Sequence, residues 1–361
     1  MMSQKIYNFN AGPAILPHEV LVKAQKELLN YNGIGMSVME ISHRTKEYEE
    51  INDVTIALFR ELMGLGPNHK VIFLGGGAST QFAMLPMNLL SQEKTAAYVE
   101  TGSWAEKAIK EAKKFGNVHV AASSKDKNYS YIPKLKGSDV PDDSVYLHIT
   151  SNNTIFGTQW HEFPNVSVPL VCDMSSDILS RQLNFKSFDM IYAGAQKNVG
   201  PAGVTIVIIK DDLLEKCSDS NPVMFNYKTH AAENSLYNTP PVFPIYMVKL
   251  VLEWMKAQGG LSIIEGWNRA KQEVIYDIIG QNSDYYKGHA QRESRSWMNI
   301  TFRLPSPELE EKFTKESQAA GFIGLKGHRS VGGIRVSLYN AMPIEGAEKL
   351  AEFMQKFRRA N

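Results

Sequence analysis

The stretch Asp189-Met-Ile-Tyr-Ala-Gly-Ala-Gln-Lys-Asn-Val-Gly-Pro-Ala-Gly203 places one lysine, Lys197, between two apolar runs. These runs, residues 190–193 and 204–209, have the length and composition of buried β-strands. Burial removes water from an ammonium group and lowers its pKa, and the resulting neutral amine is the nucleophile that forms a Schiff base. The ordinary alternative is a solvated loop lysine, and the rest of the chain has to decide between the two.

Short apolar runs alternate with helical patterns through most of the chain. The predicted strands are residues 70–74, 96–99, 118–121, 145–149, 168–172, 190–193 and 204–209. Strands that are apolar on both faces and alternate with helices predict an α/β fold, with a mostly parallel seven-stranded sheet sandwiched by helices. The strands from 145 to 209 are too closely spaced for full crossover helices, so at least one antiparallel pair is expected there.

The pattern changes after Gly259-Gly260. A helix at 261–279 is followed by strand, helix, strand, strand and helix, which predicts a smaller C-terminal α+β domain. We therefore expect a large domain at 18–258 and a small domain at 259–361. Residues 1–17 are expected to form an N-terminal segment that packs with the small domain.

The composition excludes several classes of protein. The 361 residues carry a formal net charge of +1, which gives no reason to expect a nucleic acid or an acidic membrane as partner. The only cysteines, Cys172 and Cys217, are too few for a disulfide framework, and no Cys/His cluster suggests a metal. The first residues lack the apolar core of a signal peptide, and no run of about 18 apolar residues predicts a membrane span. A cytoplasmic protein without a metal is expected.

A carboxylate and a glycine-rich loop follow two of the predicted strands. Asp173 ends the strand 168–172 and lies 24 positions before Lys197, with one strand between them. Open α/β sheets bind ligands at the carboxyl ends of their strands, although Asp173 could also be a helix N-cap. A lysine and a carboxylate in one pocket suit pyridoxal phosphate, because the lysine forms the imine and the carboxylate keeps the pyridine nitrogen protonated. Gly75-Gly-Gly-Ala-Ser79 would hold a phosphate at a helix N-terminus, or would be a plain turn.

Other candidates stand at strand ends or in basic pairs. Trp104 would stack on a planar cofactor or pack in the core, and Thr154 would bond a phenolic oxygen or cap a loop. The basic residues His43, Arg44, His328, Arg329 and Arg335 would bind a small polyanionic substrate if they converge, and would otherwise be solvated surface groups.

Over nearly its whole length the chain resembles the phosphoserine aminotransferases, a family of class V, fold-type I pyridoxal phosphate enzymes. The matching motifs are Asn8-Phe-Asn-Ala-Gly-Pro-Ala14, Met39-Glu-Ile-Ser-His-Arg44, Gly75-Gly-Gly-Ala-Ser-Thr-Gln-Phe82, Asn152-Asn-Thr154, Asp173-Met-Ser-Ser-Asp-Ile-Leu-Ser-Arg181, Ala193-Gly-Ala-Gln-Lys-Asn198, Gly327-His-Arg329, Gly332-Gly-Ile-Arg335 and Ser337-Leu-Tyr-Asn-Ala341. Some relatives have Gly-Arg where this chain has Ala78-Ser79, so the side-chain contact of that arginine is absent.

The resemblance implies a role for each matching residue. Lys197 would be the Schiff-base lysine and Asp173 the partner of the pyridine nitrogen, with Trp104 on the ring and Thr154 at its phenolic oxygen. The cofactor phosphate would be bound by Ala78, Ser79 and Gln196, and by Asn238 and Thr239 of the other subunit of a homodimer. His43, Arg44 and Arg335 would bind the substrate from one chain, and His328 and Arg329 from the other.

The implied reaction converts 3-phosphohydroxypyruvate and L-glutamate to O-phospho-L-serine and 2-oxoglutarate in ping-pong order, for serine biosynthesis. A related substrate in vitamin B6 synthesis would give 4-phosphohydroxythreonine. Another fold-type I enzyme, such as a cysteine desulfurase-like lyase, is the alternative, but it requires a mobile reactive cysteine. A protein that only binds phosphate would leave Asp173 and Lys197 unexplained.

Overall fold

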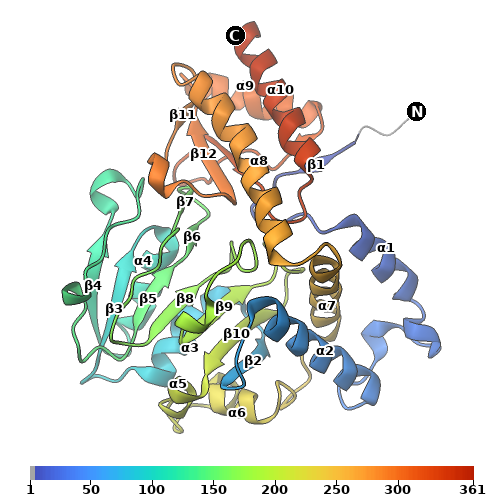
Figure 1. Ribbon diagram of the computed structural model, residues 1–361, viewed down its shortest axis with the longest axis vertical. Helices are drawn as coiled ribbons and strands as arrows, with labels where there is room; N and C mark the ends of the chain where they lie inside the picture. Colours follow the sequence, from blue (N-terminus) through green and yellow to red (C-terminus); the bar gives the residue numbers. More distant parts are fainter. Residues whose placement is uncertain (1–4) are drawn as a thin grey trace.

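The computed structural model describes residues 5–361 and contains one seven-stranded sheet with the strand order β2-β10-β9-β8-β5-β3-β4 (Figure 1). Its strands are β2 His69–Leu74, β3 Thr95–Glu100, β4 Asn117–Ser123, β5 Leu147–Thr150, β8 Leu170–Asp173, β9 Met190–Gly194 and β10 Thr205–Lys210. Strand β10 runs antiparallel to both of its neighbours, and the other pairs are parallel. The predicted mostly parallel sheet and its antiparallel pair are confirmed.

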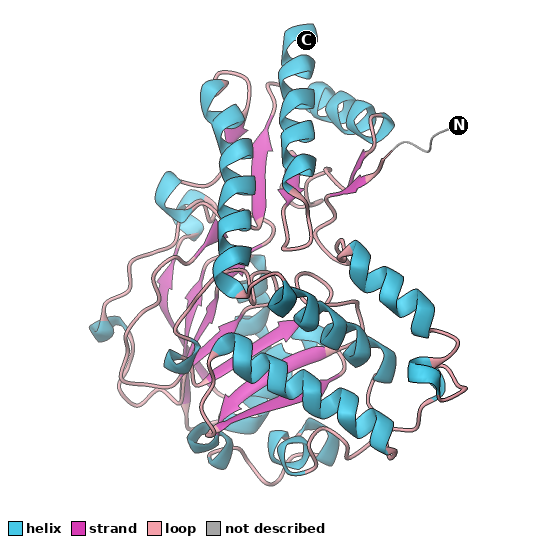
Figure 2. Ribbon diagram, turned by 45° about the vertical axis from the view of Figure 1, so that its right-hand side comes forward, coloured by secondary structure: helices cyan, strands magenta, loops and turns pink. Residues whose placement is uncertain are grey.

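Helices cover both faces of this sheet because the central strands bury side chains on both sides. The first face packs against α1 His18–Glu27, α2 Lys46–Met63 and α7 Val242–Ala257. The second face packs against α3 Gly77–Leu89, α4 Ser103–Ala112, α5 Asp211–Glu215 and α6 Tyr227–Ala232. Strand β2 shows the alternation, since Phe73 belongs to the first core while Ile72 and Leu74 belong to the second. Figure 2 shows helices lying across one face of the sheet.

The C-terminal part has a separate core. A three-stranded antiparallel sheet has the order β11-β12-β14, and three helices accompany it. The elements are α8 Leu261–Gln281, β11 Lys287–Gly288, β12 Asn299–Arg303, α9 Pro307–Ala319, β14 Ile334–Ser337 and α10 Ile344–Ala360. The Ser306 hydroxyl caps α9 by accepting from the N–H of Leu309, with Pro307 at the first helical position.

The N-terminal segment pairs with this C-terminal part. Of the two strands predicted before the last helix, the first is short, β13 Phe322–Ile323, and it pairs in parallel with β1 Tyr7–Asn8. Gly321 and Gly324, both with positive φ, limit β13 to these two residues. Tyr7 and Phe9 belong to the C-terminal core. We propose the division 18–258 and 259–361, with residues 5–17 attached to the second part; residues 1–4 lie outside the described residues.

Short elements complete the chain. The hairpin β6 Asn152–Asn153 and β7 Thr158–Gln159 was not predicted, because its residues are polar although they are buried. Single 3-10 turns lie at Tyr31–Gly33, Val38–Glu40, Lys125–Lys127, Gly137–Asp139, Phe185–Ser187, Val223–Phe225 and Arg292–Ser294. Within residues 5–361, none of the helices combines the length and apolarity that crossing a membrane requires.

Candidate active site

The carboxyl ends of β2, β3, β5, β8 and β9 lie at one edge of the sheet, because these strands run in the same direction. A cavity of about 190 Å³ opens at this edge. Its lining residues are Gly76, Gly77, Ala78, Ser79, Trp104, Thr150, Asn152, Asp173, Ser175, Ser176, Gln196 and Lys197. The structure therefore brings together six of the predicted cofactor residues: Ala78, Ser79, Trp104, Asp173, Gln196 and Lys197.

Lys197 lies in the tight connection between the antiparallel strands β9 and β10. The connection is held by the N–H groups of Ala195 and Gly200, which donate to the carbonyls of Val204 (3.1 Å) and Ala195 (2.9 Å). Lys197 Nζ donates to Thr154 Oγ1 at 2.9 Å, which places the predicted Thr154 beside it. Burial lowers the pKa of Lys197 to about 8, although the negative charge of Asp173 opposes the shift. A neutral amine is therefore accessible near neutral pH.

Asp173 ends β8 as a buried carboxylate. Its Oδ1 accepts two hydrogen bonds from Ser175, from the backbone N–H at 2.9 Å and from the hydroxyl at 2.6 Å. Its Oδ2 has no hydrogen-bond partner within the described part of the chain, and Asp173 lines the cavity. Burial raises the pKa of Asp173, while the hydrogen bonds from Ser175 and the charge of Lys197 oppose this effect.

The N-terminus of α3 supplies an anion site in the same cavity. Its N-cap, Gly76, has φ +85° and no side chain, so the N–H groups of Gly77, Ala78 and Ser79 have no capping acceptor. A Cβ at Gly76 would lie 1.9 Å from Thr80 Oγ1, so the helix can begin here only with glycine. These free donors and the helix dipole suit a phosphate group.

Trp104 forms the aromatic wall of the cavity. It lies in the first turn of α4, and its indole Nε1 is buried without a hydrogen-bond partner among residues 5–361. Lys197 Nζ is 5.4 Å from the ring centroid, and Lys107 Nζ is 4.3 Å from it. The ring is therefore placed to stack on a planar group that is attached to Lys197.

The N-terminal segment forms a wall beside the lysine that the sequence did not predict. A Cβ at Gly12 (φ +136°) would lie 3.1 Å from Lys197 Cγ, and the N–H of Ala14 donates to the carbonyl of Gln196 at 2.9 Å. Tyr339 holds the segment from the other side, because its hydroxyl donates to the carbonyl of Ala11 at 2.8 Å. No local pattern marks these residues, since their role depends on contacts across more than 180 positions.

Four basic residues of the same chain, His328, Arg329, Arg335 and Lys107, lie close to one another. Arg335 lies on β14, and its Nε is buried without a partner in the described residues. Burial lowers the pKa of His328, and the positive charges of Arg335, Arg329 and Lys107 lower it further. None of these three cations forms an ion pair with a carboxylate in the described structure. Lys107 was not predicted as a site residue. It lies three residues after Trp104, and this spacing on a helix would have placed it beside the tryptophan.

The pair His328 and Arg329 lies on a turn that leads directly into β14, near Arg335 of the same chain. Their assignment to the site of the other subunit stays a prediction from the resemblance. Val331 of this turn packs with Trp104 against the cluster that contains Phe156. His43 and Arg44 do not line the cavity, and their side chains form no hydrogen bond or ion pair across the residues that the structure describes.

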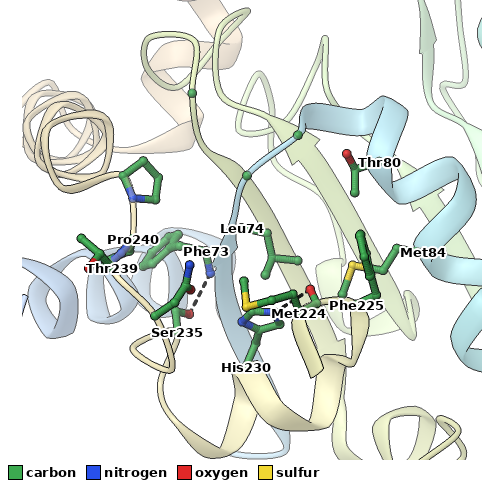
Figure 3. A pocket seen from close by; sticks show the side chains of 15 residues that line it. Phe73, Leu74, Thr80, Met84, Met224, Phe225, His230, Ser235, Thr239 and Pro240 are labelled. Carbon is green, nitrogen blue, oxygen red and sulfur yellow. Dashed lines mark hydrogen bonds between the residues drawn. The ribbon is translucent and has the colours of Figure 1, made fainter. Parts of the chain in front are cut away.

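Asn238 and Thr239 line a second cavity, of about 570 Å³, rather than the first. The two cavities share Gly76, and the second is also lined by Thr80 and by Met224 and Phe225. Figure 3 shows Thr239 and Pro240 on one side of the end of β2 and Thr80 on the other. Met224 and Phe225 are each 42% exposed, which is unusual for large apolar side chains at a cavity.

Comparisons with known proteins agree with this geometry. The family model described as Aminotransferase class-V matches residues 6–350. A phosphoserine aminotransferase of Geobacillus kaustophilus (strain HTA426) is 55% identical over 356 residues, and one of Bacillus subtilis (strain 168) is 55% identical over 358 residues; each match covers 99% of both chains.

Solved structures give the same result. A phosphoserine aminotransferase from Bacillus circulans subsp. alkalophilus has a TM-score of 0.96 and 53% identity, with 99% of both chains covered. A phosphoserine aminotransferase structure that describes radiation damage of its Schiff base has a TM-score of 0.96 and 51% identity, covering 99% of this chain and 100% of the other. With a lysine, a carboxylate, a tryptophan and a helix N-terminus around one cavity, this chain belongs to the aminotransferase class-V family and, within it, to the phosphoserine aminotransferases.

Proposed function

We propose that the chain is a pyridoxal-phosphate-dependent transaminase that interconverts 3-phosphohydroxypyruvate and L-glutamate with O-phospho-L-serine and 2-oxoglutarate. The observation that carries this proposal is the cavity itself. Lys197, with its pKa lowered to about 8, and the buried carboxylate of Asp173 face one space at the carboxyl edge of the sheet. The high identity to phosphoserine aminotransferases over 99% of the chain supports the choice of substrates.

The residues around the cavity fit the cofactor. Lys197 would hold it covalently, the free Oδ2 of Asp173 would accept from the ring nitrogen, and Trp104 would cover the ring. Thr154, beside the lysine amine, would bond the phenolic oxygen. The uncapped N–H groups at the start of α3, from Ala78 and Ser79, would bind the phosphate together with Gln196. When bound, pyridoxal phosphate supplies an electron-poor ring that stabilises negative charge at the substrate Cα.

Lys197 has a second task as the general base and acid. When free of the cofactor, Lys197 Nζ would take the proton from the substrate Cα as a base and would later donate it as an acid. The lowered pKa keeps a useful fraction of the amine neutral near pH 7. The hydrogen bond to Thr154 orients Nζ, and the packing of Gly12 against the lysine stem limits its movement.

The basic residues would recognise the substrate's two acidic ends. Arg335, half-buried and with a buried Nε that has no partner among the described residues, would bind the α-carboxylate through its planar fork. His328, Arg329 and Lys107 would bind the distal phosphate of one substrate and the distal carboxylate of the other. A site with several cations and no paired carboxylate suits both groups, because a phosphate carries up to two negative charges and a carboxylate one.

We further propose a homodimer whose second chain completes the site. His43 and Arg44, whose side chains have no partner among the described residues, would reach the substrate bound by the other chain. Asn238 and Thr239 would reach the cofactor phosphate of the other chain from the adjoining cavity. The half-exposed Met224, Phe225 and Tyr237 beside this cavity would be covered in the dimer. The enzyme would act in the cytoplasm in serine biosynthesis, and in vitamin B6 synthesis where 4-phosphohydroxythreonine is the product.

The cysteine desulfurase alternative is disfavoured by the state of the thiols. Burial raises the pKa of Cys217 to about 12 and that of Cys172 well above its usual value. Both cysteines are buried, Cys172 inside β8 and Cys217 after α5. A desulfurase needs an accessible thiolate, and neither cysteine provides one.

The test is a half-reaction followed by absorbance. Pure protein with pyridoxal phosphate should absorb near 400 nm, and L-glutamate or O-phospho-L-serine should each remove this band without a second substrate. Lys197→Ala should lose the band and turnover. A variant that still cycles at a near-normal rate would refute the assignment of Lys197. A response to glutamate but not to phosphoserine would refute the substrate.

A further inference from the structure

The carboxylate of Asp173 is bonded asymmetrically by a single neighbouring residue, Ser175. Both donors of Ser175, its N–H at 2.9 Å and its hydroxyl at 2.6 Å, go to Oδ1. Oδ2 receives no hydrogen bond from any residue of the described range, and Asp173 lines the cavity. One oxygen of the carboxylate is therefore held by the protein, and the other is left for a ligand.

The orientation of the Ser175 hydroxyl is fixed by a third contact. The N–H of Gly194, the last residue of β9, donates to Ser175 Oγ at 3.1 Å. A hydroxyl has one hydrogen, and with an N–H directed at its oxygen the hydrogen is turned toward Asp173. The contact also ties the end of β8 to the end of β9, three residues before Lys197. The two groups on which the chemistry depends are thus connected through one serine side chain.

These contacts oppose the cost of burial. A buried carboxylate tends to take up a proton, because its charge loses hydration. Two hydrogen bonds to the same oxygen favour the ionised form instead. Ser175 is the first of the groups that counteract the effect of burial on Asp173, ahead of the charge of Lys197.

We propose that Ser175 is a positioning residue for the reaction: it holds Asp173 ionised through Oδ1 and turns Oδ2 toward the ring nitrogen of the cofactor. This inference rests on the proposed function, because it assumes that the cavity binds pyridoxal phosphate. It concerns a residue that touches neither the substrate nor the reacting atoms. Its effect on the ring nitrogen would pass through the carboxylate of Asp173, and a ligand without that nitrogen separates this effect from the loss of the contact with Gly194.

The test compares two ligands on the full-length protein freed of cofactor. Pyridoxal phosphate has the ring nitrogen, and its 1-deaza analogue has a CH group in the same place, so only the first can bond to Asp173. Dissociation constants are measured by quenching of tryptophan fluorescence. Ser175→Ala should weaken pyridoxal phosphate binding roughly tenfold, as expected for the loss of one hydrogen bond to a charged group, and should leave deaza-analogue binding within about twofold.

Two further variants control for structural damage. Ser175→Thr keeps the hydroxyl and should bind pyridoxal phosphate within about threefold of the original. Ser151→Ala removes a hydroxyl that lies within hydrogen-bond distance of the backbone carbonyl of Asp173 (3.0 Å) and of the carboxylate of Asp177, but it leaves the Asp173 carboxylate untouched. It should lower the melting temperature without changing the ratio of the two dissociation constants. Ser175→Cys, with a weaker donor, replaces the alanine variant if that variant does not fold.

A spectroscopic readout reports on the proton directly. The ¹⁵N chemical shift of the ring nitrogen in labelled cofactor should move toward the neutral-pyridine value in Ser175→Ala, and should stay at the protonated value in Ser175→Thr and Ser151→Ala. Equal weakening of both ligands in Ser175→Ala, or an unchanged shift, would overturn the proposal. If the original protein bound neither ligand, the proposed function would fail as well, whereas a failure confined to the Ser175 variants would leave it standing.

Discussion

In the chain freed of cofactor, Lys197 should react with amine reagents as a base whose pKa is near 8. Burial lowers this pKa, the negative charge of Asp173 raises it, and the positive charge of Arg335 lowers it. Replacing either neighbour should therefore shift the pKa in opposite directions. Asp173→Asn should lower it further, and Arg335→Ala should raise it.

The size of the effect follows from the fraction of neutral amine. At pH 7 an amine with a pKa of about 8 is roughly one-tenth neutral. A lysine in an unfolded chain, with a pKa of ~10.4, is neutral in only about 1 molecule in 2,500 at the same pH. The neutral fraction of Lys197 is therefore roughly 200-fold larger than that of a lysine in water.

Competitive acetylation between pH 6 and 10, read by mass spectrometry of the peptide that contains Lys197, measures this pKa. The unfolded chain gives the reference profile. Lys271 serves as an internal control, because burial lowers its pKa to about 7 but its Nζ is enclosed, donating to the carbonyl of Tyr339 at 2.8 Å. It should remain unlabelled in the folded protein. A midpoint for Lys197 above about pH 9.5, or shifts of the same sign in both neighbour variants, would refute the reasoning.

Four further changes test other parts of the structure. Lys271→Met should remove a pH dependence of the unfolding free energy. Between pH 7 and ~10.4 the amine of Lys271 binds a proton in the unfolded chain but not in the folded chain, so the stability of the original protein rises with pH. Urea unfolding should show that the original protein gains on the order of 2 kcal/mol from pH 7 to 9 relative to the variant. Equal slopes would mean that the buried amine is charged. Thr154→Val removes the hydrogen bond to Lys197 Nζ and should lower kcat roughly five- to tenfold with little change in melting temperature; an unchanged kcat contradicts the role. Lys107→Ala should raise KM for phosphoserine about fivefold and KM for glutamate less than twofold, with Lys107→Arg close to the original; equal effects on both substrates count against a phosphate contact. Gly12→Ala introduces a Cβ 3.1 Å from Lys197 Cγ at a residue with φ +136°. The variant should have a kcat at least tenfold lower and an unfolding free energy lower by about 1–3 kcal/mol. A normal kcat would show that the N-terminal segment moves aside without affecting Lys197.

The central pair of the site was predictable because its position depends on sheet direction alone. Asp173 and Lys197 each follow a strand, and the carboxyl ends of neighbouring parallel strands share an edge. The glycine loop was predictable for the same reason, since it lies between a strand and a helix. The strands themselves could be located in the sequence because both of their faces are buried, which makes them continuous apolar runs.

Other features depend on contacts that no local pattern encodes. The hairpin of Asn152 and Thr158 is buried and polar, and its side chains bond to one another and to distant residues, so it has no apolar alternation. From the local sequence, Ser175 resembles a capping serine. Its other contact, with the N–H of Gly194 at the end of β9, depends on how the two strands pair. The pairs His43-Arg44 and His328-Arg329 have the same composition, so the residues alone do not separate their roles, and only the resemblance assigns them to different chains.

The contact between the first residues and the lysine has a consequence for synthesis on the ribosome. Tyr7 pairs with Phe322, so 322 − 7 = 315 residues separate the emergence of the two partners. At a translation rate of about 5–20 residues per second, roughly 15 to 60 seconds pass between the synthesis of Tyr7 and that of Phe322. During that interval Gly12 has no fixed place beside Lys197. The pocket is thus completed by two segments that are synthesised 315 residues apart, and a chain that terminates before residue 322 would carry Lys197 without a finished site around it.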